Sequence, residues 1–406
     1  MDYPYVIVGG GLAGASAIEG IRSRDTSGRI LLISRENVRP YHRPPLSKGL
    51  WFGKSTPDEL WVHADNYYRE QNVELALRRE VLDLNLEART VTDDHGVEYG
   101  YEHLLLATGG RPKPMPSQTE GGIEVHYFRN LEDYLILQER SRRVQHALVV
   151  GAGFIGLELA AALRHTGLEV TLLYPGEYPL ARVLPRDLGL FIADYYRQQG
   201  VEAVSNDSIV DFQENHGVIQ ARTQGGNVVS TQMVVAGIGL RLNTALAEGA
   251  GLEIENGILV DEFGRTSDPA IYAAGDIAEF PYLALGMRTR VEHWDHASHH
   301  GRAVGANMAG AEQAYDHLPL FFSDFFDIGW EAVGEVDSSL RVEPVWKEEN
   351  REGVLFYLRD DVVCGVLLWN RWGLVDWARD LIRAAKPMSA AERAAAIPVD
   401  PPPATP

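Results

Sequence analysis

Apolar residues in the first two thirds of the chain form short uninterrupted runs, and a glycine-rich turn follows two of them. Residues 5–8 are such a run, and after the glycine turn the alanine-rich stretch 13–21 has the composition of a helix. The same order recurs at 147–173. Strands of a parallel sheet are buried on both faces, so their apolar residues are continuous rather than alternating. Each block therefore predicts a βαβ unit, and two copies predict a duplicated architecture.

The rest of the pattern predicts further strands and a different C-terminal section. Additional strands are predicted at 81–86, 97–106, 233–240 and 271–276. From about residue 319, aromatic-rich strands at 354–358 and 362–369 alternate with a helix near 374–385. Ser389 followed by Glu392 has the spacing of a capping box and predicts a last short helix. The proline-rich end, 401–406, is expected to be disordered.

Composition and charge narrow the class of protein. The length of 406 residues corresponds to two or three domains. A net charge of −20 disfavours nucleic acids and anionic membrane surfaces as partners. The single cysteine, Cys364, excludes a disulfide framework, a cysteine zinc site and electron relay through a redox dithiol. We find neither a run long enough to span a bilayer nor a secretory signal, so a cytoplasmic protein is expected.

Both glycine turns have the spacing Gly-x-Gly-x-x-Gly between a strand and a helix. The glycines are Gly9, Gly11 and Gly14 in the first turn and Gly151, Gly153 and Gly156 in the second. Without Cβ atoms they let a pyrophosphate approach the backbone, and the helix N-terminus supplies N–H donors and a positive dipole. Two such turns predict two dinucleotides. A flavin and a nicotinamide are the simplest pair, because hydride transfer between them is a complete reaction.

A carboxylate after the second strand of such a unit holds a ribose hydroxyl. In the first block this position falls at Arg35 and Glu36, of which only Glu36 is a carboxylate. In the second block Glu177 is the only carboxylate nearby, one residue later than expected. No arginine is apparent in that loop for a 2′-phosphate, Arg182 being the nearest, so NADH is the expected cofactor.

Two carboxylates allow both a functional and an ordinary interpretation. Asp276 follows a predicted strand and could hold a polyol such as ribityl, but alone it is as readily a helix N-cap. Glu158 falls on the predicted buried face of the helix after the second glycine turn, unless it is an ordinary surface residue of that helix. A buried carboxylate needs a partner, which points to Lys48 or to an amide of a ligand.

Two basic segments were weighed in the same way. The loop 39–48 carries three prolines and four basic side chains, which suggests a nearby anion or electron-rich ring, or else a stiff solvated loop. His296 and His300 share a helical face, but no third ligand has metal spacing. We therefore predict no metal, and a polar and aromatic wall beside a cofactor instead.

Together these motifs resemble the flavoprotein family that contains apoptosis-inducing factor and the oxygenase-coupled ferredoxin reductases of the putidaredoxin reductase type. The resemblance runs from about residue 5 to about residue 385. The segments that carry it are RPPLSK at 43–48, ATG at 107–109, GAGFIGLE at 151–158, AAGD at 273–276, VEHWDHA at 291–297 and FSD at 322–324.

The resemblance implies an α/β fold with two Rossmann-like dinucleotide-binding domains, in the three-layer form of glutathione reductase, and a C-terminal α+β domain. The implied domains are a split FAD domain (1–112 and 243–318), an NAD(P)H domain (113–242), the C-terminal domain (319–393) and a flexible tail (394–406).

The resemblance also implies roles for individual residues. Lys48 would pair with Glu158 near the flavin N5, and Glu292 would border the nicotinamide, so these three are the catalytic candidates. With the first glycine turn, the expected FAD contacts are Gly9, Gly11, Leu12, Ala13, Gly14, Arg35, Glu36, Arg43, Lys48, Val81, Ala107, Thr108, Gly109, Arg129, Gly275, Asp276, Glu292, His293, Trp294 and Phe322. The expected NAD contacts are Gly151, Gly153, Phe154, Ile155, Gly156, Glu158, Glu177 and Gly239.

Three positions depart from the family pattern. Arg35 stands where the family usually has the carboxylate for the adenosine ribose of FAD, and Gly176 stands where the corresponding NAD carboxylate is expected. Phe322 replaces a tryptophan, so the ring at this position has no indole N–H.

The expected function is an FAD-dependent NAD(P)H oxidoreductase that passes electrons from NADH through the flavin to a one-electron acceptor, a [2Fe–2S] ferredoxin. Basic residues of 39–48 and Arg371, Arg379 and Arg383 are candidate docking charges for an acidic carrier. Two alternatives stay open. One is a redox-responsive protein like apoptosis-inducing factor that dimerises on reduction, and the other is a reductase of quinones or other small molecules. The sequence leaves a monomer and a homodimer equally open.

Overall fold

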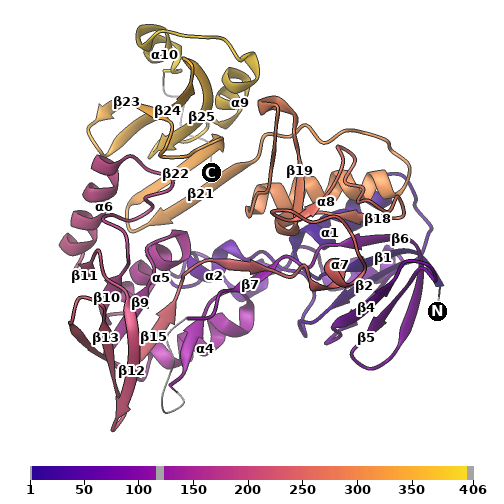
Figure 1. Ribbon diagram of the computed structural model, residues 1–406, viewed down its shortest axis with the longest axis horizontal. Helices are drawn as coiled ribbons and strands as arrows, with labels where there is room; N and C mark the ends of the chain where they lie inside the picture. Colours follow the sequence, from indigo (N-terminus) through magenta and orange to yellow (C-terminus); the bar gives the residue numbers. More distant parts are fainter. Residues whose placement is uncertain (1, 116–122, 400–406) are drawn as a thin grey trace. The chain divides into compact units, whose positions relative to one another are not determined.

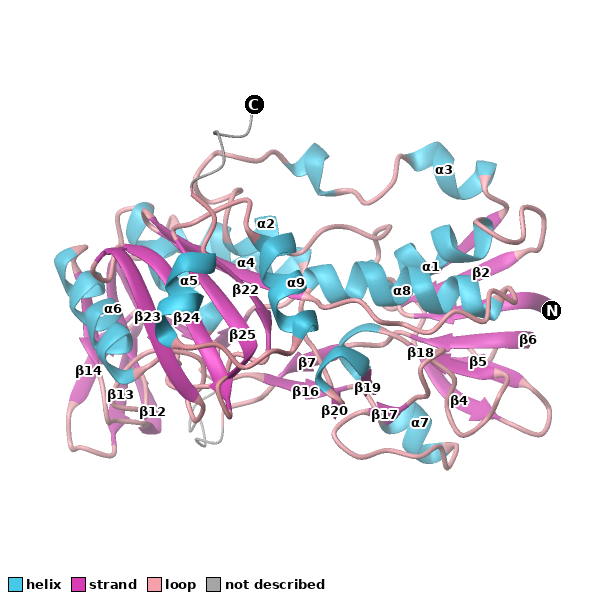
Figure 2. Cartoon of the chain, turned by 90° about the horizontal axis from the view of Figure 1, so that it is seen from above, coloured by secondary structure: helices cyan, strands magenta, loops and turns pink. Residues whose placement is uncertain are grey.

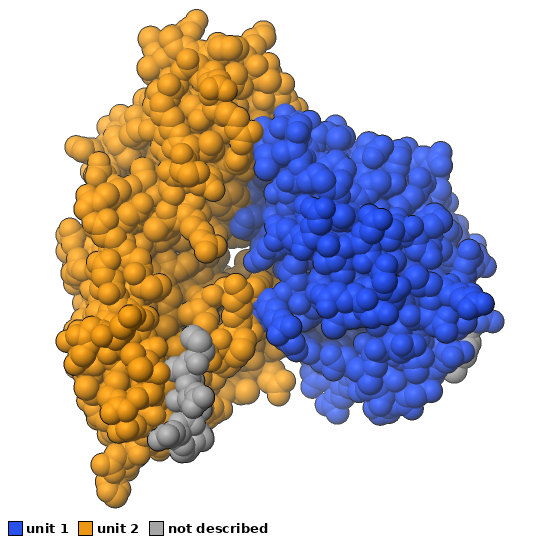
Figure 3. Space-filling view, in the orientation of Figure 1, with its two compact units in different colours: residues 1–42, 58–111, 241–320 blue, residues 43–57, 112–240, 321–406 orange. Residues whose placement is uncertain are grey.

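The computed structural model describes residues 2–115 and 123–399. The chain divides into two compact units, which Figure 3 colours blue and orange. Unit 1 comprises residues 1–42, 58–111 and 241–320, and unit 2 comprises residues 43–57, 112–240 and 321–406. Each unit thus contains segments that are far apart in the sequence.

Unit 1 is built on a seven-stranded sheet with the order β3-β2-β1-β6-β5-β4, in which β18 also pairs with β6 (Figure 1). The strands are β1 (Asp2–Val8), β2 (Ile30–Ser34), β3 (Val73–Leu77), β4 (Val81–Asn85), β5 (Thr90–Asp93), β6 (Glu98–Leu106) and β18 (Ile271–Ala273). β1, β2, β3, β6 and β18 pair in parallel, whereas β4 and β5 pair antiparallel. The register aligns Val8 with Leu106 and Leu106 with Ala273, so three strands end at the same edge.

Two helices of unit 1, α1 (Leu12–Arg22) and α8 (Trp294–Met308), pack closely against each other. A Cβ on Gly301 or Gly305 would overlap the backbone of Ala13 or Ala17, so the glycines of α8 permit this close approach. Ala13, Ala17 and Val304 belong to the same buried core as Ile7 and Leu105 of the sheet. The first turn of α1 is therefore fixed by both the sheet and α8.

Shorter elements complete this part of the chain. They are η1 (Pro57–Leu60), α3 (Asp65–Glu70), α7 (Ala245–Gly249), β17 (Ile258–Leu259), η2 (Gly275–Ile277), β19 (Ala278–Tyr282), η3 (Leu283–Leu285) and β20 (Met287–Thr289). The chain passes between the units through β7 (Gly110–Pro112) and β16 (Leu240–Leu242), which pair with each other.

Unit 2 contains a five-stranded parallel sheet with the order β11-β10-β9-β15-β8. Its strands are β8 (Val125–Tyr127), β9 (His146–Val150), β10 (Glu169–Leu173), β11 (Val201–Val204) and β15 (Met233–Ala236). The helices of this part are α2 (Pro44–Ser47), α4 (Leu131–Ser141), α5 (Phe154–His165) and α6 (Arg186–Gln198). A three-stranded antiparallel sheet of β12 (Ile209–Asn215), β13 (Val218–Thr223) and β14 (Val228–Thr231) follows.

The C-terminal part of unit 2 is a five-stranded sheet with the order β21-β22-β25-β24-β23 (Figure 2). Its strands are β21 (Leu320–Phe325), β22 (Ile328–Gly334), β23 (Arg341–Glu348), β24 (Glu352–Arg359) and β25 (Val362–Trp369). Helices α9 (Val375–Ala384) and α10 (Ala390–Ala396) follow, and Ser389 caps α10 through the predicted capping box.

The α/β fold with two parallel-sheet units and a β-rich C-terminal section is confirmed. The exact domain boundaries stay a prediction, although α10 continues to Ala396, past the residue 394 at which we expected a flexible tail to begin. The expectation for 401–406 lies outside the described residues. Among the described residues, none of the helices combines the length and apolar character that crossing a bilayer requires.

Candidate functional site

The first glycine turn joins β1 to α1, and its three glycines have different surroundings. A Cβ on Gly9 would overlap the carbonyl of Ala107, and a Cβ on Gly14 would overlap the carbonyl of Gly9. Gly9 also has a φ of +129°, which side-chain-bearing residues rarely adopt. Gly11, by contrast, has no neighbour within 4 Å of its Cβ position, and it is the N-cap of α1 without a side-chain cap. The turn thus presents an open helix N-terminus, as pyrophosphate binding requires.

The second glycine turn, between β9 and α5, repeats this division. A Cβ on Gly151 would lie 2.5 Å from the carbonyl oxygen of Gly237, and a Cβ on Gly156 would overlap the carbonyl of Gly151. Gly153 has open space around its Cβ position and is the N-cap of α5. Each unit therefore carries one cradle that fits the pyrophosphate of a dinucleotide.

Of the two candidate ribose residues after β2, Glu36 has the more suitable surroundings. The Tyr41 hydroxyl donates a hydrogen bond of 2.6 Å to Glu36 Oε2. Arg35 is exposed, and its guanidinium lies 3.6 Å from the Glu80 carboxylate. The roles of Glu36 as the ribose carboxylate and of Arg35 as an FAD contact both stay predictions.

Two other predicted FAD segments lie at the edge where β6 and β18 end. After β6, Thr108 Oγ1 donates to the carbonyl of Asn243 at 3.0 Å, and Asn243 Nδ2 donates to the Thr108 carbonyl at 2.8 Å. After β18, Gly275 packs against Ala13 of the first turn of α1. Asp276 is thus held beside the first glycine turn, as a role in binding the same nucleotide requires.

The N-terminus of α8 carries the next group of predicted residues. His293 is its N-cap, and burial lowers the pKa of the imidazole to about 4, so the ring is neutral at pH 7. Trp294 Nε1 donates to His42 Nδ1 at 3.0 Å. The carboxylate of Glu292 lies 2.5 Å from the Arg290 guanidinium, which neutralises it within unit 1.

The two histidines that we weighed as metal ligands support the fold instead. His296 and His300 are both buried on α8. His296 Nδ1 lies 3.0 Å from the Tyr315 hydroxyl, and His300 Nδ1 accepts a hydrogen bond from the Gly275 backbone at 3.3 Å. His300 thereby fixes the turn that carries Asp276.

The predicted pair of Lys48 and Glu158 is present in unit 2. Lys48 Nζ forms an ion pair with Glu158 Oε1, and the two side chains are only 12% and 5% exposed. Ser47 and Ser323 each donate a hydrogen bond of 2.6 Å to this carboxylate. A buried ion pair is favourable only when such additional hydrogen bonds satisfy its remaining lone pairs. The catalytic roles of Lys48 and Glu158 stay predictions.

The sequence did not indicate the two serines as partners of Glu158. The available signal was their position inside the motif segments 43–48 and 322–324, which the resemblance had identified. In the second segment, the ring of Phe322 lies beside the Lys48 ammonium, which is 5.5 Å from the ring centroid. The Arg43 guanidinium donates a hydrogen bond of 2.6 Å to the carbonyl of Arg129, so these two predicted FAD contacts also lie together in unit 2.

The expected NAD ribose carboxylate, Glu177, is exposed after β10 and forms a two-pronged ion pair with Arg186, whose Nε lies 3.1 and 3.0 Å from its two carboxylate oxygens. These hydrogen bonds lower the pKa of Glu177. The expectation that no arginine stands at this loop is therefore wrong. Arg186 is the first residue of α6, and its distance in sequence from the loop concealed it.

The remaining predicted NAD contacts lie around the second glycine turn or close to it in the chain. Phe154 opens α5 and packs against Phe321 and Trp330, with ring centroids 6.1 and 5.5 Å apart. Ile155 is 38% exposed. Gly239 has a φ of +102°, and its carbonyl accepts a hydrogen bond from the Lys113 backbone at 2.9 Å.

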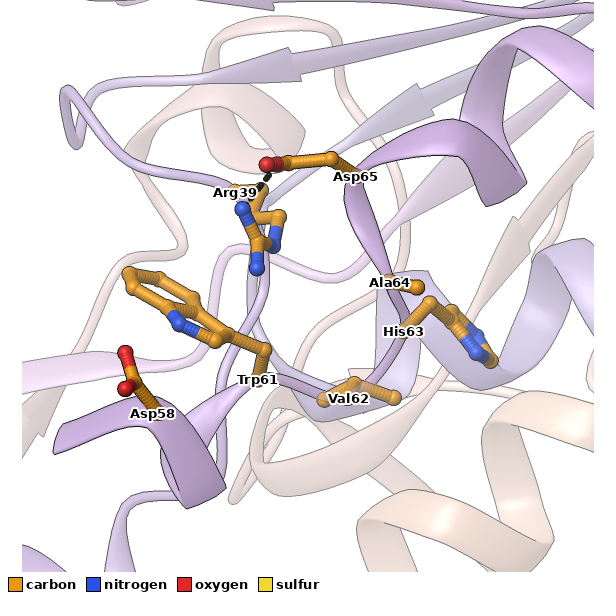
Figure 4. Close-up of a pocket in the computed structure, with 7 residues that line it drawn as sticks. All are labelled: Arg39, Asp58, Trp61, Val62, His63, Ala64 and Asp65. Atoms are coloured by element: carbon orange, nitrogen blue, oxygen red, sulfur yellow. Dashed lines mark hydrogen bonds and ion pairs between the residues drawn. The ribbon is translucent and has the colours of Figure 1, made fainter. Parts of the chain in front are cut away.

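Val81 and the loop 39–48 are the last of the segments that the sequence analysis singled out. Val81 is the first residue of β4 and lies opposite Asp93. Arg39 forms an ion pair with Asp65 and stacks 4.1 Å from the ring centroid of Trp61, beside a pocket of about 440 Å³ in unit 1 (Figure 4). Of the basic side chains of this loop, Arg39 and Lys48 are thus already paired with carboxylates.

Comparison with known proteins agrees with this geometry. A family model described as pyridine nucleotide-disulphide oxidoreductase matches residues 3–301. A second model, described as the C-terminal part of mitochondrion-associated apoptosis-inducing factor, matches 304–353 and 343–384.

Individual relatives cover most of the chain. The ferredoxin–NAD(+) reductase component of the anthranilate 1,2-dioxygenase system of Burkholderia cepacia is 35% identical over 82% of this chain and 82% of its own. A monodehydroascorbate reductase of Cucumis sativus is 33% identical over the same shares. Among solved structures, the reductase in a covalent putidaredoxin reductase–putidaredoxin complex superposes with a TM-score of 0.88 at 31% identity, covering 95% of this chain and 94% of that one.

Proposed function

The chain belongs to the pyridine nucleotide-disulphide oxidoreductase family, and we propose that within it the protein is a ferredoxin reductase. It is an FAD-dependent NAD(P)H oxidoreductase, and the two glycine cradles fit these two dinucleotides. Bound FAD supplies the conversion between two-electron and one-electron transfer. The proposal concerns the protein that accepts the electrons.

The observation that carries the proposal is the state of the only cysteine. Cys364 is buried in β25, where its thiol donates to the carbonyl of Tyr357 at 3.3 Å. Burial raises the pKa of this thiol to about 11, which disfavours the reactive thiolate. With no second cysteine in the chain, electrons leave without passing through a dithiol, directly to an external carrier.

The residues of unit 2 have a positioning role in this proposal. Glu158 holds the Lys48 ammonium in one place, and Ser47 and Ser323 orient the carboxylate. A fixed positive charge stabilises negative charge that develops next to it during hydride transfer. The match of Lys48 to the family position near the flavin N5 is the support for this role.

Two relatives support a small iron–sulfur acceptor. One is named as the ferredoxin–NAD(+) reductase component of a dioxygenase system, and another was crystallised as a complex with putidaredoxin. Among the proposed docking charges, Arg379 is only 15% exposed and lies 3.1 Å from Asp376, and Arg371 donates a hydrogen bond of 3.2 Å to the carbonyl of Pro398. A cytoplasmic location stays part of this proposal.

The test is reduction of cytochrome c by NADH with and without an acidic [2Fe–2S] ferredoxin. Cytochrome c reports electrons that have passed through the ferredoxin. We expect the ferredoxin to raise the rate at least tenfold, in proportion to its concentration below saturation. An unchanged rate with a ferredoxin that a known reductase does reduce would exclude a ferredoxin reductase.

A second candidate is a reductase of a small organic radical or quinone, which the likeness to monodehydroascorbate reductases favours. Rapid NADH oxidation with such an acceptor, together with no response to ferredoxin, would select it. The C-terminal match to apoptosis-inducing factor keeps the redox-responsive alternative open. Slow flavin reoxidation in air and dimer formation on adding NADH would select that function.

A further inference from the structure

Three metal-ligating side chains of unit 1 lie together and have no part in the proposed electron transfer. They are Asp295, His299 and His317. Asp295 and His299 are four residues apart on α8 and so project from one face of the helix. His317 comes from the segment between α8 and β21. The sequence had pointed to His296 and His300 instead, whose Nδ1 atoms form hydrogen bonds within the fold.

The two imidazoles converge on one carboxylate. His317 Nε2 lies 2.6 Å from Asp295 Oδ2. His299 Nδ1 lies 2.9 Å from the backbone carbonyl oxygen of Asp295 and 3.3 Å from its Oδ1. The two rings are stacked with centroids 3.8 Å apart and planes within 10°.

The surroundings fix the carboxylate and leave one side open. The Asp295 side chain is 5% exposed, and the Leu320 backbone N–H donates to its Oδ2 at 3.1 Å. His317 is 19% exposed and His299 is 49% exposed. An ion can therefore enter from the side of His299, and water can reach a further coordination position there.

The ligand atoms of the three residues lie near one another, although not yet at the distances found around a bound metal ion. One ligand atom of each residue lies within 4.8 Å of the others. In a tetrahedral site with bonds of about 2.1 Å the ligand atoms lie about 3.4 Å apart, so the three side chains would have to move up to about 1.4 Å toward one another to bind an ion. Two imidazoles and a carboxylate suit zinc and neighbouring transition metals, whereas magnesium and calcium prefer oxygen ligands alone.

We propose that Asp295, His299 and His317 bind one divalent transition-metal ion, with water as a further ligand, and that the ion ties the segment after α8 to the helix. Three protein ligands plus water form a four-coordinate site. The ion would stabilise the folded chain, since a ligand that binds only the folded state raises the free energy of unfolding.

The test measures zinc binding to the FAD-loaded protein. The protein is treated with EDTA, equilibrated with zinc chloride and separated from free ion, and zinc per chain is measured by inductively coupled plasma mass spectrometry. We expect one tightly held zinc per chain and a higher Tm in zinc than in magnesium. His299→Gln should weaken zinc binding at least tenfold and abolish the rise in Tm.

A matched histidine variant provides the control. His95→Gln changes an exposed histidine of unit 1 outside the cluster and should bind zinc like the parent protein. His317→Gln is a second test of the same site, and the flavin content and circular dichroism of each variant show whether it is folded. The proposal is overturned if the parent protein retains no zinc, or if folded His299→Gln and His317→Gln chains bind zinc as the parent does.

Discussion

Glu158 is a carboxylate almost wholly removed from water, and three side chains compensate for its charge. The ammonium of Lys48 and the hydroxyls of Ser47 and Ser323 all reach it. The arrangement leaves no carboxylate oxygen without a partner. Breaking this pair should therefore lower the free energy of unfolding by more than breaking an ion pair in solvent, which contributes about 0–1 kcal/mol.

Replacing Glu158 with Gln should both destabilise the protein and slow flavin reduction. The amide cannot compensate for the charge of Lys48, and breaking a buried pair on one side costs about 3–5 kcal/mol. Asp324 lies 3.8 Å from the same ammonium and would compensate part of its charge in the variant. We therefore expect the free energy of unfolding to fall by about 2–4 kcal/mol. Urea unfolding measures the loss, and stopped-flow absorbance should show NADH-driven flavin reduction slowed at least tenfold.

The control for this variant is Glu169→Gln, which changes an exposed carboxylate at the start of β10. Its free energy of unfolding should stay within about 0.5 kcal/mol of the parent value. Equal effects of the two substitutions would contradict the importance of the buried pair.

Arg186 should influence the choice between NADH and NADPH. While it is paired with Glu177, the carboxylate is less available to a ribose diol, whereas the negative charge of a 2′-phosphate could compete with Glu177 for the guanidinium. Arg186→Ala should therefore raise the ratio of kcat/KM for NADH to that for NADPH about fivefold or more, equivalent to about 1 kcal/mol. Steady-state kinetics with both cofactors measure this ratio. A ratio that falls or stays constant would show that the adenosine ribose of the nicotinamide cofactor does not bind beside Glu177 and Arg186.

The packing of α1 against α8 links two parts of the predicted FAD site. The glycine turn opens α1, and His293 and Trp294 begin α8. Both helices must approach closely enough for backbone contact, which the glycines of α8 permit. Small changes at this helix pair should thus affect FAD retention even though they lie at a distance from the glycine turn.

Gly305→Ala tests this packing. The new Cβ would overlap the backbone carbonyl of Ala17, and overpacking of this kind costs about 1–3 kcal/mol. We expect a lower Tm and partial loss of FAD on gel filtration. Gly249→Ala in α7 is the matched control, since its Cβ meets no atom within 4 Å. Equal FAD retention by both variants would contradict the proposed link.

Local sequence patterns were sufficient to predict the main elements. Strand, glycine turn and helix occur within about twenty residues, so both βαβ units could be recognised. The limits of elements were less accurate, because the strand predicted at 271–276 ends at Ala273 and the short helix η2 follows. The apolar run 233–240 is interrupted after β15, where Gly239 adopts a φ of +102°.

Contacts between distant segments could not be predicted in this way. Ser323 is 165 residues from Glu158, and His317 is 22 residues from Asp295. No local periodicity encodes such pairs, which depend on how the chain folds back. The resemblance paired Lys48 with Glu158 because both residues lie in segments that carry it, 43–48 and 151–158, but it gave no indication of Arg186 beside Glu177.

The molecule as a whole has one nucleotide cradle in each compact unit. If each glycine turn holds one dinucleotide, as we propose, the reaction depends on the intact chain. The overall charge of −20 opposes an acidic partner, and docking would rely on local basic residues. Arg39, Lys48 and Arg379 are already paired with carboxylates, so we expect weak, short-lived complexes.

Anaerobic titration of the purified protein with NADH, followed by flavin absorbance, tests the central claim most directly. The purified protein should be yellow, and its flavin absorbance should be bleached in proportion to the NADH added, up to about one equivalent per chain, because one hydride reduces one flavin. A protein that does not bind FAD, or whose bound FAD stays oxidised under excess NADH and NADPH, would contradict it.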